Sequence, residues 1–553
     1  MSRDIANLAE REFDILIVGG GIHGVTLARE AALAGLSVAL VDKADFCSAT
    51  SANSLKILHG GIRYLQQANL PRVRQSVIER RTMLQIAPHL VEPLPCAMPT
   101  YGHGMKGKEV MFCGLLAYNL LSGDRNQGLP TGKAIPSCRI GSRTEWLAIA
   151  PDLDNPRFTG AALWHDAIAL NTERLGLGFV ASAIQAGAHV ANYIEVTGFQ
   201  RNGRDVTGVT AIDRITNQPL TIRAKVTVNN TGPWIRETLR LLGETVTTPE
   251  YRCALAMNVV LRKQLIPRHA VGLTAYKEGW ENGRLFFFVP WRDRTMVGTY
   301  LRPHTGSPDQ LKVTPDDIQS FIANLNLAYP AAQLKPKDIA FIQAGLMPAT
   351  DQDVSPGGEP RLLNQFQILD HAKGDNLNGL MSVLGVKWTT ARDVAQRTLA
   401  LLLTKLGRSP VNRLSAIHPL PGGDIPDLEV LIKEIIQSGL PEETAHHLVC
   451  HYGLRCRDVI RLGATNPLWL KPLGEGTCVT GAEIIFALRE EMAQTLADVV
   501  LRRTGLGSAG RPSKAALMNA AVIMARELAW DAPRLDKELA ILRALPCWPV
   551  EER

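Results

Sequence analysis

The sequence predicts an α/β fold followed by an all-α region: a Rossmann-like dinucleotide-binding domain, an antiparallel-sheet substrate domain and a helical C-terminal domain. Three observations predict this fold. A strand, a glycine turn, a helix and a second strand open the chain, period-two strands occur in its middle, and helical periodicity runs through residues 427–553. At 553 residues the chain is too long for one compact core, so two or three domains are expected.

The opening unit has the spacing of a dinucleotide-binding turn. Residues 15–18 form a short apolar run that is typical of a buried parallel strand. Glycines then follow at the G-x-G-x-x-G spacing. Gly19 permits the tight turn, Gly21 lets a pyrophosphate approach the backbone, and Gly24 lets the next helix pack on the strand.

An acidic residue closes this unit. The helix over about 24–34 stops at Gly35, and a second apolar strand ends in Asp42, where a carboxylate can hydrogen-bond a ribose hydroxyl. An acid at this place disfavours a 2′-phosphate, so the motif predicts FAD or NAD as ligand and does not choose between them. A structural βαβ unit that binds nothing is the alternative interpretation.

Composition excludes several classes of protein. With 46% hydrophobic and 20% charged residues, the chain is predicted to be a globular enzyme rather than a disordered protein. The net charge of +7 is dispersed. It suits an anionic substrate or an anionic membrane surface and predicts no nucleic-acid partner, although a basic solvated surface explains it equally well.

The cysteines and the N-terminus predict a cytoplasmic protein. Nine cysteines occur without a C-x-x-C pair, which suits a reducing compartment, and the Cys and His residues of 446–456 match no zinc spacing, so no metal is predicted. Residues 1–12 do not resemble a signal peptide, and no run reaches the ~18 apolar residues that span a bilayer. The apolar run 110–121 is predicted to be either a core helix or a helix lying on a membrane or a partner.

The domain boundaries follow from changes in pattern. Residues 1–410 are predicted to form the oxidoreductase region, with dinucleotide-binding parts at about 12–90, 160–240 and 375–405 and an antiparallel part at about 245–370. A Pro- and Gly-rich linker over 411–426 leads to an all-α domain over 427–553. Within it, helices are predicted near 427–438, 442–452, 482–503 and 513–528.

Several motifs together resemble the FAD-dependent, quinone-linked glycerol-3-phosphate dehydrogenase family. The similarity covers roughly residues 13–530, and its most specific elements are the His-Gly-Gly-x-Arg-Tyr and Thr-Gly-Pro-Trp segments. The matching stretches are Ile17-Val-Gly-Gly-Gly-Ile-x-Gly24, Ala49-Thr-Ser51, Lys56-x-x-His-Gly-Gly-x-Arg-Tyr-Leu65, Asn230-Thr-Gly-Pro-Trp234, Val289-Pro-Trp291, Gly298-Thr299 and Lys387-x-Thr-Thr-x-Arg392.

The resemblance implies FAD rather than NAD, in a DAO-type fold. It implies oxidation of the C2 hydroxyl of glycerol 3-phosphate to dihydroxyacetone phosphate, with hydride transfer to flavin N5 and electrons passed to a quinone or another acceptor. The catalytic residues facing the substrate would be Arg63, Tyr64 and Lys387. FAD would be lined by Gly19, Gly21, Gly24, Asp42, Ser51, His59, Gly60, Gly232, Gly385 and Thr389.

The substrate pocket departs from the family pattern. The family's Gly-x-Arg-Pro element is Gly345-Leu-Met-Pro348 here, which places Met347 at an arginine position, and a second family arginine in a downstream strand falls at Asn364. The family's Lys-Gly-Ser-His segment ends in Asn258, and its Gly-Thr-Thr-Asp segment becomes Gly298-Thr-Tyr-Leu301. Losing two arginines should weaken phosphate binding, since hydrogen bonds to charged groups contribute roughly 1.5–3 kcal/mol each.

Three hypotheses remain open from the sequence. The first is the family reaction, with phosphate held by Arg63, Lys387 and either Arg252 or Arg392. The second is an FAD oxidoreductase for a different, non-phosphorylated alcohol, amine or hydroxy acid. The third is a catalytically weak flavoprotein that serves as a partner subunit. The resemblance also implies peripheral attachment to the inner face of the cytoplasmic membrane, and the sequence leaves a homodimer open.

Overall fold

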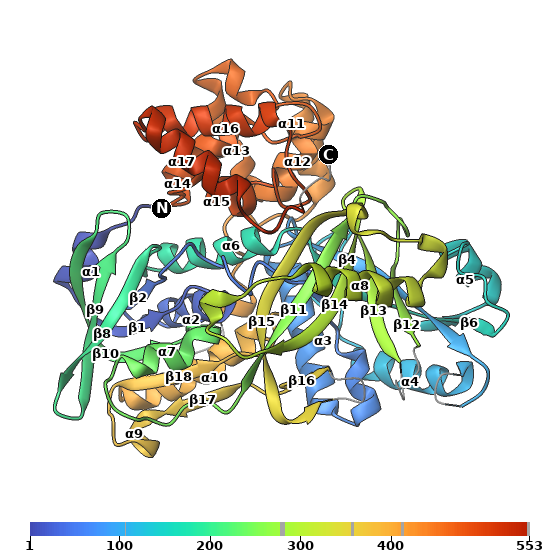
Figure 1. Cartoon of the computed structure of the whole chain (residues 1–553), viewed down its shortest axis with the longest axis horizontal. Coiled ribbons are helices and arrows are strands. Elements are labelled where there is room, and N and C mark those ends of the chain that lie inside the picture. The colour runs from blue at the N-terminus through green and yellow to red at the C-terminus, as the bar shows by residue number, and fades with distance from the viewer. Residues whose placement is uncertain (105–106, 277–282, 355–358, 411–413, 550–553) are drawn as a thin grey trace.

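The chain folds into two β-sheets and a C-terminal group of helices that lies above them in Figure 1. The computed structural model describes residues 1–549 except 105–106, 277–282, 355–358 and 411–413, and for 351–354 it describes the backbone. The predicted fold class, α/β followed by an all-α region, is confirmed. The boundaries proposed for the domains stay a prediction.

The first sheet carries the predicted dinucleotide unit. Its order is β17-β18-β10-β1-β2-β7, and the hairpin β8–β9 continues it along β10. The pairs β18–β10, β10–β1, β1–β2 and β2–β7 are parallel, and six of the seven residues of β1 are buried, as a central strand requires. The strands are β1 (Glu12–Val18), β2 (Val38–Val41), β7 (His189–Ala191), β8 (Ile194–Asn202), β9 (Asp205–Asp213), β10 (Gln218–Asn229), β17 (Gln367–Asp370) and β18 (Leu380–Leu384).

The second sheet is mostly antiparallel and takes in more of the chain than the predicted 245–370 segment. Its order is β16-β15-β11-β14-β13-β12-β4-β6-β3, with β5 added beside β6. Strands from residues 57–169 therefore form one side of it, because β4 pairs with both β6 and β12. The strands are β3 (Ile57–Leu58), β4 (Val91–Tyr101), β5 (Arg139–Gly141), β6 (Phe158–Ala169), β11 (Arg252–Leu261), β12 (Ala270–Ala275), β13 (Arg284–Trp291), β14 (Arg294–His304), β15 (Ile339–Val354) and β16 (Pro360–Leu362).

Helices that precede residue 410 cover the sheets. Helix α2, which starts at the glycine turn, packs against α6 and α10, and this contact forms much of the first core. Helix α3 packs on α4 and on the short helix η1 (Ile62–Gln67). The helices are α1 (Ile5–Glu10), α2 (Ile22–Leu33), α3 (Leu70–Ile86), α4 (Lys108–Leu121), α5 (Arg143–Ile149), α6 (Thr172–Gln185), α7 (Ile235–Arg240), α8 (Pro315–Ala328), α9 (His371–Gly374) and α10 (Ala391–Lys405).

The C-terminal helices differ from the prediction at three places, because α13 and α17 were not predicted and one predicted helix is broken. The single helix expected over 482–503 is broken into α14, α15 and a π-helical turn (Val499–Arg503). Met492 has a φ of +54°, which no α-helix accommodates, and Thr495 then caps a new helix by accepting from the amide of Asp498. The helices are α11 (Leu428–Gln437), α12 (Glu442–Tyr452), α13 (Cys456–Ala464), α14 (Gly481–Glu490), α15 (Leu496–Asp498), α16 (Lys514–Glu527) and α17 (Ala532–Arg543).

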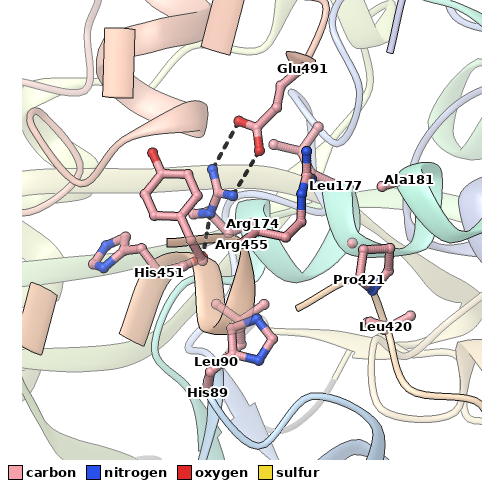
Figure 2. A pocket seen from close by; sticks show the side chains of 12 residues that line it. His89, Leu90, Arg174, Leu177, Ala181, Leu420, Pro421, His451, Arg455 and Glu491 are labelled. Carbon is pink, nitrogen blue, oxygen red and sulfur yellow. Dashed lines mark hydrogen bonds and ion pairs between the residues drawn. The ribbon is translucent and has the colours of Figure 1, made fainter. Parts of the chain in front are cut away.

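Buried ion pairs join the C-terminal helices to the first sheet. Asp45, in the loop after β2, accepts hydrogen bonds from Arg502 and from both terminal nitrogens of Arg503, at 2.6 and 2.7 Å. Arg174 of α6 forms a two-pronged pair with Glu491, at 2.8 and 3.0 Å, beside a cavity of about 20 Å³ (Figure 2). The loops at the carboxyl edge of the first sheet are therefore fixed partly by the C-terminal helices.

Candidate active site

The carboxyl edge of the first sheet collects most of the predicted cofactor residues. Gly19 follows directly after β1, Asp42 after β2 and Gly385 after β18. These three strands run parallel within the first sheet. Gly19 has a φ of +110°, and a Cβ there would lie 2.5 Å from the carbonyl oxygen of Asn230. A Cβ on Gly24 would lie 1.8 Å from the Gly19 carbonyl oxygen. Only glycine fits this turn, and ligands of open α/β sheets bind at this edge.

Two polar side chains support the first turn of α2. Asp42 accepts a hydrogen bond from the amide of Gly20 at 2.6 Å and one from the amide of Ala44 at 2.8 Å. Ser51 Oγ accepts from the amide of Ile22 at 2.9 Å. Burial raises the pKa of Asp42 to about 6. Both side chains lie at the N-terminal end of a helix, where a phosphate or ribose group is favoured.

His23 was missed by sequence reasoning and lies against the Gly385 turn. A Cβ on Gly385 would lie 2.0 Å from His23 Nε2, so this turn also requires glycine. Burial lowers the pKa of His23 to about 4, which keeps the ring neutral at physiological pH. His23 stands at the second x position of the G-x-x-G motif, and this position was the sequence signal that could have identified it.

The structure also describes two other residues predicted to line FAD. Gly232 has a φ of +58° with open space beside its Cα, and Thr389 is buried.

The His59-Gly60 segment is held by an aspartate that the sequence did not reveal. Asp166 of β6 accepts hydrogen bonds from the amide of Gly60 at 2.6 Å and from Trp164 Nε1 at 3.2 Å. His59 Nδ1 lies 3.5 Å from the same carboxylate. Burial opposes ionisation of Asp166, but its hydrogen bond with His59 and the charge of Arg80 lower its pKa on balance. This carboxylate therefore fixes both the segment and the orientation of the imidazole.

Positive charge gathers on one buried tyrosine ring. Tyr64 lies in η1, and the Nζ atom of Lys387, which donates a short hydrogen bond to the Tyr64 hydroxyl, lies 4.3 Å from the ring centroid. The guanidinium carbons of Arg72 and Arg63 lie 4.7 and 5.1 Å from that centroid. Burial, with Arg63 and Arg72 adding repulsion, lowers the pKa of Lys387 to about 6. The structure thus brings Arg63, Tyr64 and Lys387 together and adds Arg72.

The altered residues of the pocket lie in different surroundings. Asn258 of β11 is buried and accepts a hydrogen bond from the Thr299 hydroxyl at 2.9 Å. Met347 of β15 is half-buried, two residues from Gly345, whose Cβ would lie 3.0 Å from Thr50 Cα. The second sheet therefore meets the dinucleotide-binding loop at Thr50, next to a cavity of about 40 Å³.

Two sequence-based placements are corrected by the structure. Asn364 was placed in a strand, but it is exposed and follows the end of β16. Arg392 cannot serve as a phosphate ligand because it is buried in a two-pronged ion pair with Glu79, at 2.6 and 2.9 Å. Arg252 is exposed at the start of β11. Arg392 therefore does not take the place of the residues that the family pattern lacks here, and the role suggested for Arg252 stays a prediction.

The residues present fit a flavin dinucleotide. Backbone approaches that only glycine permits occur at the carboxyl ends of β1 and β18. Three buried polar atoms around this edge have no hydrogen-bond partner among the described residues: His23 Nδ1, Asn230 Nδ2 and Trp388 Nε1. Such atoms are normally satisfied by a ligand or by water. Within the same described part of the chain, no group of three or more His, Cys, Asp or Glu side chains could hold a metal ion.

Known proteins and family models match this chain over most of its length. A model of the family "FAD dependent oxidoreductase" (DAO) matches residues 14–392, and a model of the "C-terminal domain of alpha-glycerophosphate oxidase" matches residues 415–535. Glycerol-3-phosphate dehydrogenase from Synechocystis sp. is 30% identical over 97% of each chain. The mitochondrial enzyme of Bos taurus is 29% identical over 96% of this chain and 73% of its own.

A solved structure has the same fold. It is the glycerol-3-phosphate dehydrogenase from Bacillus halodurans complexed with FAD, which aligns with a TM-score of 0.76 at 22% identity and covers 99% of this chain and 98% of its own.

Proposed function

Because this chain belongs to the FAD-dependent glycerol-3-phosphate dehydrogenase family, we propose that it oxidises the C2 hydroxyl of glycerol 3-phosphate to the ketone of dihydroxyacetone phosphate and passes the electrons to a quinone. The predicted family, the FAD cofactor and the assignment as an FAD-dependent oxidoreductase are confirmed by the family match. The observation that carries the proposed substrate is the positive charge around Tyr64, beside the Gly385 turn.

The cofactor supplies hydride acceptance, and the protein supplies its binding site. The glycine turn, Asp42 and Ser51 would hold the dinucleotide half at the N-terminus of α2. The Gly60 and Gly385 turns would lie against the flavin half. His59, Gly232 and Thr389 complete the set of residues assigned to FAD, and all of these assignments are proposals.

Lys387 is proposed to accept the proton of the C2 hydroxyl. Its pKa of about 6 leaves the amine neutral, and hence basic, at physiological pH. Arg63 and Tyr64 lie within reach of the same space and would orient the anionic substrate.

A second candidate function is supported by Met347. This residue stands where the family has an arginine, which favours a flavin oxidoreductase for a substrate without phosphate. The relatives named above are glycerol-3-phosphate dehydrogenases, and they favour the first function. Anaerobic mixing of the purified holoprotein with glycerol 3-phosphate tests both. Fast bleaching of the flavin band at sub-millimolar substrate supports the first function, whereas bleaching only by an unphosphorylated alcohol, amine or hydroxy acid supports the second.

Met347→Arg is expected to lower the KM for glycerol 3-phosphate roughly tenfold. A guanidinium there would add a charge-assisted hydrogen bond to phosphate, which contributes roughly 1.5–3 kcal/mol. Steady-state kinetics with an artificial electron acceptor measure the change, and Met347→Leu, which adds no charge, serves as the control. If neither KM nor turnover changes, Met347 does not lie in the substrate pocket.

Helix α4 is proposed to attach the protein to the membrane surface. Its exposed apolar side chains are Val110, Phe112, Leu116 and Leu120, which is 77% exposed, and the helix packs beside η1, the element that carries Tyr64. No helix among the described residues is long and apolar enough to cross a bilayer. A surface helix of this kind fits peripheral binding next to a quinone pool.

Vesicle flotation tests this attachment. The double variant Phe112→Ser/Leu120→Ser is expected to lose binding to anionic vesicles at least tenfold, because burying each large apolar side chain contributes roughly 1.5–3 kcal/mol. Leu468→Ser is the matched control, since Leu468 is 69% exposed on the C-terminal helices. Equal flotation of the double variant and the control would exclude α4 as the membrane surface.

A further inference from the structure

Arg72 is a positively charged residue at the candidate site that belongs to none of the sequence motifs described above. It lies in the first turn of α3, and its guanidinium carbon is 4.7 Å from the centre of the Tyr64 ring. The Nζ atom of Lys387 lies 4.3 Å from the centre of the same ring, and the guanidinium carbon of Arg63 lies 5.1 Å from it. Two guanidinium groups and the amine of Lys387 thus converge on one buried aromatic side chain from three separate places in the chain.

The backbone around Arg72 is firmly held. Asn69 caps α3 by accepting a hydrogen bond from the Arg72 amide at 3.3 Å, and the Ser76 hydroxyl donates to the Arg72 carbonyl at 2.9 Å. The first turn of α3 packs directly on Gly61, where an added Cβ would lie 2.7 Å from Ser76 Cβ. Since Gly61 adjoins the His59-Gly60 segment, Arg72 is positioned beside the candidate flavin site.

The charges of this cluster are unbalanced. Among the described residues, Arg63, Arg72 and Lys387 form no ion pair with a carboxylate. Two other arginines of α3 differ in this respect, because Arg74 and Arg81 share Asp124 at 2.6 and 2.7 Å. The guanidinium groups of Arg63 and Arg72 repel each other, and after burial they are the further cause of the lowered pKa of Lys387. A bound anion would relieve this repulsion.

We propose that Arg72 binds the phosphate group of the substrate and replaces the arginine that the family pattern has at Met347. The inference rests on the proposed function and deepens it, since it assigns phosphate specificity to a residue on a different element. A guanidinium offers several N–H donors in a fixed fork that suits phosphate oxygens. The helix N-terminus that carries Arg72 adds favourable electrostatics for an anion.

The test compares Arg72→Gln, Arg72→Lys and the control Arg74→Gln in the holoprotein. Binding of inorganic phosphate is measured by titration of the flavin absorbance, and KM and kcat for glycerol 3-phosphate are measured separately. Arg72→Gln is expected to weaken phosphate binding and raise KM by roughly 10- to 100-fold, with a smaller fall in kcat. Arg72→Lys should lose only a few-fold, because it keeps the charge but not the fork. Arg74→Gln should match the wild type.

The outcomes separate this inference from the proposed function. Unchanged phosphate affinity in Arg72→Gln overturns the role of Arg72, even where glycerol 3-phosphate bleaches the wild-type flavin. Phosphate affinity that depends on Arg72 in a protein that glycerol 3-phosphate fails to bleach supports the anion site and overturns the proposed substrate. If Arg72→Gln does not fold, Arg72→Lys decides: wild-type affinity for phosphate, with wild-type KM, contradicts a binding fork.

Discussion

Lys387→Ala is expected to lower kcat by roughly 10²–10⁴, the contribution of a positioned general base, while the protein retains its flavin. The reason is geometric and electrostatic. Lys387 touches Tyr64, lies in the turn after Gly385, and has a pKa of about 6. Steady-state turnover and the flavin absorbance of the purified protein are measured on the same preparation. Lys405→Ala is the control, because Lys405 pairs with Asp370 away from this cluster.

The pH profile gives the same prediction a second test. The charged form of Lys387 cannot accept a proton, so kcat/KM of the wild type should rise with pH through about 6 and then level off. In Lys387→Ala the rise should vanish. Equal losses of turnover and flavin would instead make Lys387 a cofactor anchor, and a wild-type kcat/KM that falls as pH rises through 6 would mean that the charged form is required.

The dinucleotide-binding part of the fold was predictable because its signals are local. The apolar run of β1, the three glycines and Asp42 define a strand, a turn, a helix and a second strand within 31 residues of sequence, 12–42. The second sheet was predicted only in its later strands. Strand β4 contains Pro93, Pro95 and Pro99, and a proline within a run argues against a sheet strand. Its pairing with β6 is a tertiary contact that overrides this local preference.

Site residues that belong to a sequence motif could be predicted from the sequence. Residues that reach the site only because separate elements pack together could not. Lys387 and Arg63 belong to recognisable segments, and the structure brings them together on Tyr64. Arg72 lies in an ordinary helical turn, and its role depends on how α3 packs against Gly61. Asp166 lies on β6 of the second sheet, and its role depends on the contact that this strand makes with Gly60. Asn364 was misplaced because β16 ends two residues before it.

Asp45→Ala is expected to lower the free energy of unfolding by about 3–5 kcal/mol, because removing one partner of a buried ion pair leaves the other charge uncompensated. Asp45 and Arg503 are fully buried, Arg502 is half-buried, and Asn192 also donates to this carboxylate, at 2.9 Å. Chemical denaturation of the holoprotein measures the loss. Glu434→Ala is the control, since its pair with Arg457 is exposed, and it should change stability by less than about 1 kcal/mol.

The same pair makes the stability loss depend on pH. Burial alone would raise the pKa of Asp45, but Arg503 and Arg502 hold it below its ordinary value. A lowered carboxyl pKa stabilises the fold at pH values above the unfolded pKa, about 3.9, and this contribution is lost as pH falls through the folded pKa. The difference between wild type and Asp45→Ala should therefore be largest near neutral pH and shrink in acid. Because Asp45 lies three residues after Asp42, a large loss of flavin in Asp45→Ala at neutral pH would show that the C-terminal helices also hold the cofactor loop in place. Full flavin retention with the expected destabilisation would confine their role to stability.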